Sequence, residues 1–272
     1  MKKTILILGI FIGLALGITK AIILLFQDNT SKIPGMILIP KGKFIMGNNS
    51  GRIDARPAHE IYLDDYYIDK YEVSNKDYKK FIDATGYSAP NVDTNKYPWA
   101  KQYNWHNNTY PKGTENLPVV LVNWNDANAY AKWCGKRLPT EAEWEKAAKG
   151  PNNLLFPWGN EWDSTKCNVS SSGIKTTLPV NSNKNGISGY GVFNMIGNVW
   201  EWCSDYYDKD YYKVSPKISP KGPEVGATRI IRGGSWNTFG NNNFRCDSRE
   251  SQFPSVKSLD IGFRCVKDIE KK

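Results

Sequence analysis

Residues 135–145 read GKRLPTEAEWE, and this stretch fixes where a helix begins. Thr140 and Glu143 have the spacing of a capping box, in which each side chain accepts the backbone N–H of the other residue. Gly150 is of the residue type that commonly ends helices, so we expect the helix to stop there. Acidic residues fill the first turn, where they complement the helix dipole, and the charges of this stretch therefore indicate a structural role.

Two further helices are predicted before this one. The first begins after Ser74, a favourable N-cap, and ends before Gly86. The second covers about residues 126–133 behind Asn125 and ends at Gly135.

Short apolar runs predict strands on both sides of the helices. Residues 36–40 and 42–47 predict a hairpin, and residues 61–71 alternate, with many aromatic residues, and predict one strand. In the second half of the chain helical periodicity is nearly lost, and Gly, Pro and Asn separate short strand-like runs at 228–232 and 261–266. The pattern predicts an α+β fold made of a single irregular, loop-rich domain without repeats.

The N-terminal segment has a different character. Lys2 and Lys3 precede an apolar stretch that reaches Phe26 and is long enough to cross a membrane as a helix. This indicates a signal anchor or, alternatively, a signal peptide cleaved near Gly17. Either way the domain is exported across the cytoplasmic membrane: it is anchored in the inner membrane facing the periplasm or the outside, or it is secreted. The predicted division is a leader over 1–26, a linker over 27–34 and a domain over 35–268.

Composition narrows the class of partner. The 272 residues carry a formal net charge of +9, but six lysines belong to the two terminal segments and the others alternate with acids. Without a basic stripe we expect no nucleic-acid partner. Hydrophobic residues at 40% exclude a disordered chain, and the ten tryptophans are best explained as packing for a loop-rich fold.

Four segments are distinctive in their order and spacing. They are residues 71–75 with Tyr78 and Phe81, residues 135–145, 197–202 and 232–236, followed by Gly-Phe-Arg at 262–264. Over about residues 35–267 they resemble the sulfatase-modifying-factor family, that of the formylglycine-generating enzymes. The resemblance implies that family's single-domain fold, which is mostly irregular and distantly similar to C-type lectin folds.

The resemblance also implies calcium at residues 194–201, where relatives bind it. Calcium prefers oxygen ligands, and the implied ones are the side chains of Asn194 and Glu201 with the carbonyls of Gly197 and Val199. The alternative is a loop closed by ordinary hydrogen bonds.

A second calcium site of the family would begin at Asn168 and Val169. Its later acidic ligand has no clear match before Leu178, so this second site is the weaker expectation.

The catalytic chemistry of the family is where the sequence departs. Active members bind copper through two cysteines that follow a Gly-Gly-Ser turn, because thiolates are the soft ligands that select Cu(I). Here residues 236–245, after Ser235, contain no cysteine, and Cys246 matches a position near the family's structural disulfide. We therefore expect no copper and name no catalytic residue. His59 and His106, the two histidines, cannot supply a three-histidine iron site.

Disulfides are expected in an exported domain. The resemblance implies a bridged cysteine at Cys265, whose usual partner position corresponds to Ala131. Cys134 lies one helical turn away, which makes a Cys134–Cys265 bridge the candidate. The remaining cysteines, an odd number, are Cys167, Cys203 and Cys246.

Two functions of different classes follow. The first is a binding or scaffolding module of the cell envelope whose cleft recognises a peptide or another envelope component. The rival is an oxidoreductase that generates formylglycine on sulfatase cysteines or performs a related oxidation. The candidate cleft residues of the binding module are Ser235, Trp236, Phe239, Asn241, Asn242, Asn243 and Arg249. A polar surface loop is the alternative explanation of the stretch from Ser235 to Arg245.

Overall fold

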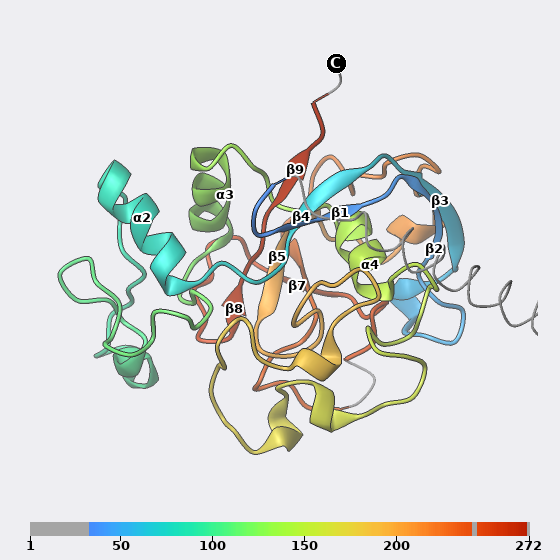
Figure 1. Cartoon of the computed structure of the whole chain (residues 1–272). Helices are drawn as coiled ribbons and strands as arrows, with labels where there is room; N and C mark the ends of the chain where they lie inside the picture. The colour runs from blue at the N-terminus through green and yellow to red at the C-terminus, as the bar shows by residue number, and fades with distance from the viewer. Residues whose placement is uncertain (1–32, 241–243, 271–272) are drawn as a thin grey trace, which may run out of the picture.

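Short strands in three separate sheets organise the computed structural model, which describes residues 33–240 and 244–270 (Figure 1). One sheet has the strand order β1-β4-β9 and a second pairs β2 with β3, all antiparallel. The third has the order β7-β6-β5-β8, in which β5 and β8 run parallel. The strands are β1 (Met36–Ile39), β2 (Gly42–Met46), β3 (His59–Leu63), β4 (Tyr66–Asp69), β5 (Trp200–Tyr206), β6 (Arg229–Arg232), β7 (Glu250–Gln252), β8 (Ile261–Gly262) and β9 (Val266–Asp268).

The first four strands form a bent ribbon instead of the predicted hairpin. In the described ladders β1 pairs with β4, with Ile39 opposite Tyr66, and β2 pairs with β3. Pro40 stands at the break between β1 and β2, where it has no N–H to offer to a ladder. The acidic pair 64–65 stands at the matching break between β3 and β4, so the predicted single strand over 61–71 divides between two sheets.

In the described part of the chain three α-helices accompany the sheets, which gives a mixed α and β domain with few helices. They are α2 (Asn75–Thr85), α3 (Trp124–Trp133) and α4 (Glu141–Lys149). Ser74 caps α2 and Gly86 ends it in the left-handed conformation, as predicted. The predicted capping box of Thr140 and Glu143 is present at α4.

Helix α3 begins two residues before its predicted start. Asn123, not Asn125, is its N-cap, and Asn123 forms a second capping box with Asp126. Both asparagines suit a cap by residue type. The acidic side chain at the third helical position therefore decides between them.

The second half of the described chain has turns and 3-10 segments, but no α-helix, as predicted. The strand predicted over 228–232 is β6. The run predicted over 261–266 is broken into β8 and β9, because Arg264 between them turns its side chain into the interior and Val73 N–H binds the carbonyl of Phe263. Strand β5, one of the two inner strands of the third sheet, was not predicted as a strand.

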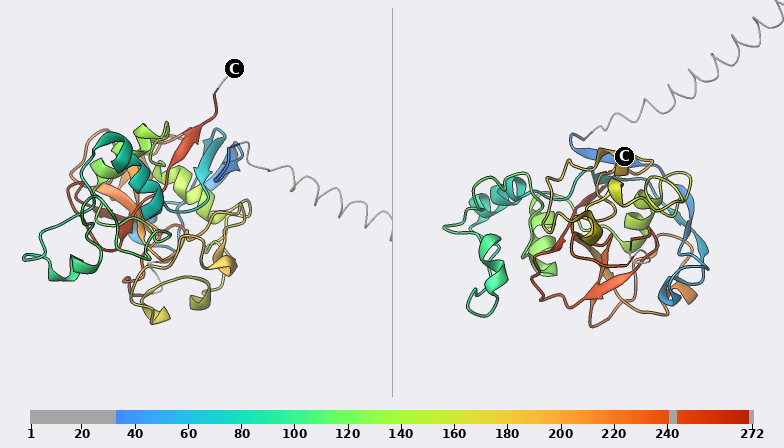
Figure 2. Two further views of the ribbon diagram at one scale, coloured as in Figure 1. Left: turned by 60° about the vertical axis from the view of Figure 1, so that its left-hand side comes forward. Right: turned by 90° about the horizontal axis from the view of Figure 1, so that it is seen from below.

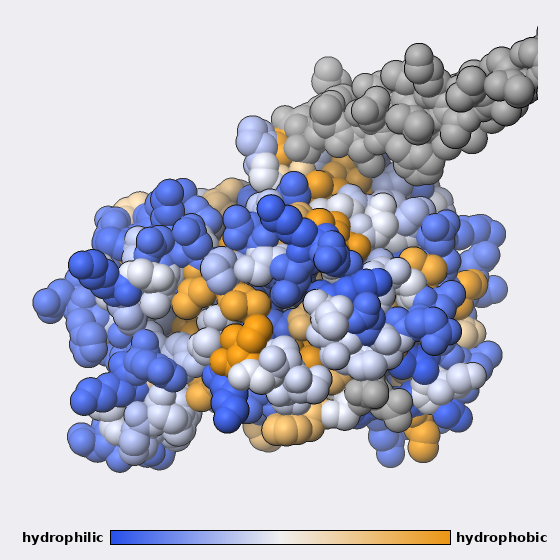
Figure 3. Space-filling model, turned by 60° about the horizontal axis from the view of Figure 1, so that its bottom comes forward, coloured by the Kyte–Doolittle hydropathy of each residue, from blue (hydrophilic) through white to orange (hydrophobic). Residues whose placement is uncertain are grey.

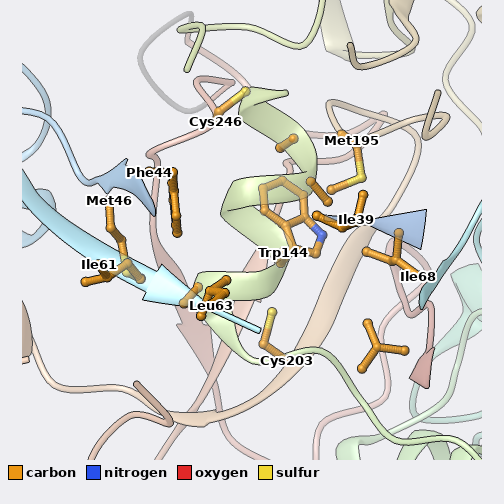
Figure 4. Packing of buried hydrophobic residues seen from close by; sticks show 14 of the residues in the cluster. Ile39, Phe44, Met46, Ile61, Leu63, Ile68, Trp144, Met195, Cys203 and Cys246 are labelled. Atoms are coloured by element: carbon orange, nitrogen blue, oxygen red, sulfur yellow. The ribbon is translucent and has the colours of Figure 1, made fainter. Parts of the chain in front are cut away.

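Helix α4 is the centre of the core (Figure 4). All nine of its residues are buried, and Trp144 packs among apolar side chains from β1 to β4 and from β5. Its two lysines are buried because their ammonium groups reach backbone carbonyls of the ribbon. Lys146 binds Pro40 O at 2.7 Å and Lys149 binds Ile45 O at 2.8 Å. These two ammonium groups therefore join α4 to the ribbon at Pro40 and in β2.

The segment that includes the 3-10 turn Pro98–Gln102 stands out from the body on the side of α2 in both views of Figure 2. The predicted leader over 1–26 and most of the linker over 27–34 lie outside the described residues. Within residues 33–240 and 244–270, no helix has the length and apolar character needed to span a bilayer.

Candidate functional site

The Gly-Gly-Ser turn directly follows β6, the strand next to β5. Gly233 and Gly234 both have positive φ, and a Cβ on Gly233 would meet the ring of Trp144 at 3.1 Å. The hydroxyl of Ser235 donates to Asp260 Oδ2 at 2.8 Å, and its N–H donates to Thr238 Oγ1 at 3.0 Å. Ser235 is fully buried, so it holds the turn in place and does not line an open cleft.

The loop beyond Ser235 does reach the surface. Trp236 is partly exposed, its backbone N–H binds Asn198 O at 3.0 Å, and its indole Nε1 has no partner in the structure. Phe239 is 74% exposed. The loop returns at Phe244, which stacks on Trp162 with ring centroids 5.1 Å apart. The candidates Asn241, Asn242 and Asn243 lie outside the described residues.

The space-filling view from below brings the lower loops of the domain forward (Figure 3). On this face apolar residues gather near the middle, and hydrophilic residues surround them. The exposed ring of Phe239 and the partly exposed indole of Trp236 give the loop its own apolar character. This part of the surface can therefore contact a partner through aromatic groups.

The candidate Arg249 belongs to the core and not to a cleft, contrary to our expectation. It is 1% exposed, and its guanidinium donates to both carboxylate oxygens of Glu141 at 2.8 and 3.0 Å. A third nitrogen donates to Asp54 O at 2.7 Å. A fully paired guanidinium at this depth has no donor to offer to a ligand.

Arg249 is one part of a buried ion network under the Gly-Gly-Ser turn. Arg232, on β6, binds Glu145 at 2.7 Å and Glu141 at 3.2 Å, and Lys149 binds Glu145 at 2.9 Å. Burial opposes ionisation of Glu145, but Lys149 and Arg232 hold its pKa at about 2. The network fixes α4 against β6 through two carboxylates that each pair with two cations.

A second polar centre joins residues 194–201 to the motif at 71–75. Asn194 Nδ2 donates to Glu72 Oε2 at 2.9 Å, and Asn198 Nδ2 donates to Glu72 Oε1 at 2.8 Å. Glu72 is 2% exposed. We did not predict Glu72 as a site residue, because no local pattern shows that it faces a loop 122 residues away.

Glu201 is the other carboxylate of this centre. Arg264 donates to both of its oxygens at 2.7 Å, and Trp144 Nε1 donates to Oε2 at 2.8 Å. Burial is the largest cause that raises the pKa of Glu72 to about 7; the charge of Arg264 opposes it, and that of Glu201 adds to it. Two buried carboxylates therefore share the charge of one arginine.

The residue types at this centre are ones that calcium uses as ligands. Glu72 and Glu201 bring carboxylate oxygens to one loop, which also contains Asn194 and the carbonyls of Gly197 and Val199. Asn194 directs its amide nitrogen to Glu72, and its oxygen accepts from Asn183. Oε1 of Glu201 accepts from Arg264, and this oxygen and that of Asn194 each have a second lone pair. In the described part of the chain no cluster of three or more His, Cys, Asp or Glu could hold a metal. An ion here would depend on amide and carbonyl oxygens.

Asn168 is held by neutral groups. Its Nδ2 donates to Thr176 O at 2.8 Å, its Oδ1 accepts from Ser172, and its carbonyl accepts the N–H of Asn198. Asn168 and Val169 are fully buried. These hydrogen bonds hold the segment around Asn168 against the loop 194–201. No carboxylate is among these partners of Asn168, so they supply no charged ligand for a second calcium ion.

Cys134 and Cys265 lie together, as the predicted bridge requires. Cys134 packs against the core cluster that contains Cys265, and both are free thiols in the structure. The bridge itself therefore stays a prediction. The remaining cysteines are buried: Cys167, Cys203 and Cys246.

Cavities lie away from the loop after Ser235. The largest of three, about 540 Å³, lies between the β3–β4 turn and the start of α4, and its wall includes Asp65, Arg137 and Asp268. The others, about 260 and 130 Å³, are lined by residues around Lys136 and around Tyr103. Of residues 235–240 and 244–249, none lines any of these three.

Comparisons with known proteins agree with this geometry. Residues 23–269 match the family described as "Sulfatase-modifying factor enzyme 1-like domain". The chain is 35% identical over 284 residues to the formylglycine-generating enzyme of Mus musculus, covering 86% of this chain and 75% of that one. It is 31% identical over 278 residues to a protein of the same organism named inactive C-alpha-formylglycine-generating enzyme 2, covering 86% and 85%. The solved structure of PvdO from Pseudomonas aeruginosa is similar with a TM-score of 0.73 and 26% identity, over 89% of this chain and 97% of that one.

Proposed function

Because the chain belongs to the sulfatase-modifying factor enzyme 1-like family, we propose that it is a member which binds a peptide segment without copper-dependent oxidation. The observation that carries the proposal is the loop after Ser235. The turn is intact and pinned to Asp260, but residues 236–245 contain no cysteine. The site keeps its position in the fold and lacks the thiols that copper chemistry requires.

Three of the other thiols, those of Cys167, Cys203 and Cys246, do not replace the missing ones. Burial raises the pKa of Cys167 to about 12, and it raises the pKa values of Cys203 and Cys246 well above the usual range. Thiols that stay protonated are poor nucleophiles and poor metal ligands. A relative at 31% identity is itself named inactive, which supports a family branch without oxidation.

The binding surface consists of the aromatic groups of the same loop. Trp236 is partly exposed, although its indole Nε1 is itself buried and has no hydrogen-bond partner among the described residues. The ring of Phe239 offers exposed apolar area next to it along the chain. A peptide strand with an apolar side chain fits both features.

Export and anchoring complete the proposal. The leader over 1–26 holds the domain at the outer side of the cytoplasmic membrane, and the peptide belongs to another protein of the envelope. Calcium occupies the centre formed by Asn194, Gly197, Val199 and Glu201, with Glu72 as an additional ligand. Its role there is structural, because it balances two buried carboxylates.

The rival function is formylglycine generation, and the observation that favours it is the 35% identity to an enzyme of that name. Full-length protein in mild detergent, loaded with Cu(I), is incubated with oxygen and a sulfatase-derived cysteine peptide. An active formylglycine-generating enzyme runs in parallel, and mass spectrometry follows the peptide.

We expect the cysteine peptide to be retained and unchanged, and a serine version of it to be retained equally. Conversion at a rate near that of the active enzyme would establish the oxidoreductase and overturn the binding role. Neither conversion nor retention would also contradict the binding role, because the loop would then not recognise an extended peptide.

A further inference from the structure

Cys134 and Cys265 meet at the edge of the first sheet, 131 residues apart in the sequence. Cys134 is the C-cap residue of α3, and Cys265 stands between β8 and β9. Cys134 packs against the core cluster that contains Cys265, the β-bridge between Arg137 and Val266 joins the two segments, and the Cys134 thiol donates to Ala131 O at 3.3 Å. We propose that these two residues form a thiol–disulfide exchange site, in which Cys134 attacks a disulfide and Cys265 resolves the product.

The two thiols differ in access. Cys134 is partly exposed, and Cys265 is fully buried behind it. A disulfide that approaches from solvent can therefore reach the sulfur of Cys134 only. Cys265 can act only on a partner that is already bound to Cys134, which is the division between an attacking and a resolving thiol.

The charges around the pair favour the same order. The hydrogen bond from Cys265 lowers the pKa of Cys134, and the ammonium of Lys136 lowers it further, against partial burial and the carboxylate of Asp69. Burial raises the pKa of Cys265 well above its usual range. Cys134 is thus the first thiolate to form.

An ion pair holds the surroundings of the two thiols. Lys136 binds Asp69 at 2.6 Å, and the other oxygen of Asp69 accepts the backbone N–H of Cys265 at 2.9 Å. A cavity of about 260 Å³ borders this ion pair and is lined by Asp69, Lys136 and Tyr130, whereas neither cysteine lines it.

The exchange balances without any further reagent. The Cys134 thiolate attacks one sulfur of the disulfide, breaks its S–S bond and releases one thiolate, which takes up a proton. Cys265 then loses its proton and attacks the Cys134 sulfur, which releases the second thiol. The two protein thiols are oxidised to one bridge as one external disulfide is reduced to two thiols.

This site is independent of the proposed peptide binding, and it differs from a permanent structural bridge in being reversible. Full-length reduced protein is labelled with iodoacetamide at pH 7, and each cysteine is followed by peptide mass spectrometry. We expect Cys134 to react at least about tenfold faster than Cys167, Cys203 and Cys246, which serve as internal controls.

Oxidised glutathione serves as the probe disulfide. Wild-type protein should form the Cys134–Cys265 bridge without accumulating a glutathione adduct, and Cys265→Ala should keep glutathione on Cys134. Excess reduced glutathione should reopen the bridge with the protein folded. If Cys265→Ala does not fold, Lys136→Gln provides a second test, since it should slow the labelling of Cys134 several-fold and leave that of Cys167 unchanged.

Three results would overturn the proposal. One is labelling of Cys134 no faster than of the buried thiols. Another is a glutathione adduct that persists on wild-type protein. The third is a bridge that opens only after unfolding, which would make it a structural disulfide.

Discussion

Arg264 and Glu201 form a two-pronged ion pair, with both nitrogen–oxygen distances at 2.7 Å and neither side chain more than 1% exposed. The pair joins β5 to the segment between β8 and β9, 63 residues apart. Arg264 also donates to the carbonyls of Phe193 and Asp69. One guanidinium therefore ties three segments of the chain to the candidate calcium centre.

Removing one partner of this pair should be costly. Arg264→Met leaves the Glu201 carboxylate buried without its counter-charge, which we expect to lower the free energy of unfolding by about 3–5 kcal/mol. Urea unfolding measures it. Lys79→Met is the matched control, because its ion pair with Asp83 is at the surface, and it should cost at most about 1 kcal/mol. Equal effects of the two substitutions would contradict a structural role for the Arg264–Glu201 pair.

Substitutions at two glycines distinguish the cost of backbone strain from the cost of a steric clash. Gly197 and Gly113 both have positive φ, but a Cβ on Gly197 would overlap the carbonyl oxygen of Asn168, whereas Gly113 has open space around it. Gly113→Ala should cost roughly 1–2 kcal/mol from strain alone. Gly197→Ala should cost at least about 2 kcal/mol more, because the two loops must separate. Similar losses in thermal unfolding would show that the Asn168 and Gly197 loops do not need this contact.

Local features of the fold were predictable, because their causes are local. Ser74, Thr140 and Glu143 cap helices through contacts with residues three positions away. The pairing of Glu72 with Asn194 connects residues 122 positions apart. No periodicity or spacing reports such a distance, so this part of the site was missed.

Buried charges explain the other errors. Arg249 is of a type usually found at the surface, and it was placed in a cleft, but Glu141 neutralises it in the core. The lysines of α4 would likewise be assigned to the solvent face by hydropathy, although Lys149 ends on backbone carbonyls of β2 and the residue after it. Partners supplied by tertiary contacts reverse what residue type alone predicts.

Asp205 should make stability depend on pH. Burial is the main cause that raises its pKa to about 7; the charges of Glu141 and Glu143 add to it, and donors from Ser204 and the Glu141 N–H oppose it. Because the folded state holds the proton more tightly than the unfolded state, this stabilising contribution is complete below about pH 4 and is lost as the pH rises through 7. Wild-type protein should therefore lose stability between pH 5.5 and 8.5.

Asp205→Asn tests this expectation, since the amide resembles the protonated acid. The loss between these pH values should shrink by about 2 kcal/mol, because only about 1.5 pH units of this window lie below the folded-state pKa. Urea unfolding at several pH values measures it, with Asp163→Asn, a largely solvent-exposed acid, as the control. An unchanged pH profile would mean that Asp205 ionises near its ordinary pKa.

Calcium should stabilise the centre around Glu72. Adding calcium at 100 times its dissociation constant raises the free energy of unfolding by about 2.7 kcal/mol, so the melting temperature should rise and EGTA should reverse the rise. Glu72→Gln removes one charged ligand and should abolish most of it, whereas Asp163→Asn should leave it unchanged. If calorimetry detects no calcium binding to wild-type protein, the loop is closed by its hydrogen bonds and side-chain amides alone.

The aromatic loop should carry the binding of the peptide probe. Trp236→Ala and Phe239→Ala should each weaken retention of the sulfatase-derived serine peptide about tenfold, because aromatic anchors at an interface supply roughly 1–3 kcal/mol each. Trp99→Ala and Phe253→Ala remove exposed rings of the same kinds elsewhere on the surface and should change nothing. Fluorescence anisotropy of the labelled peptide measures all four. If the control variants weaken binding as much as the loop variants, the peptide binds to exposed aromatic groups in general, and the loop after Ser235 has no special role.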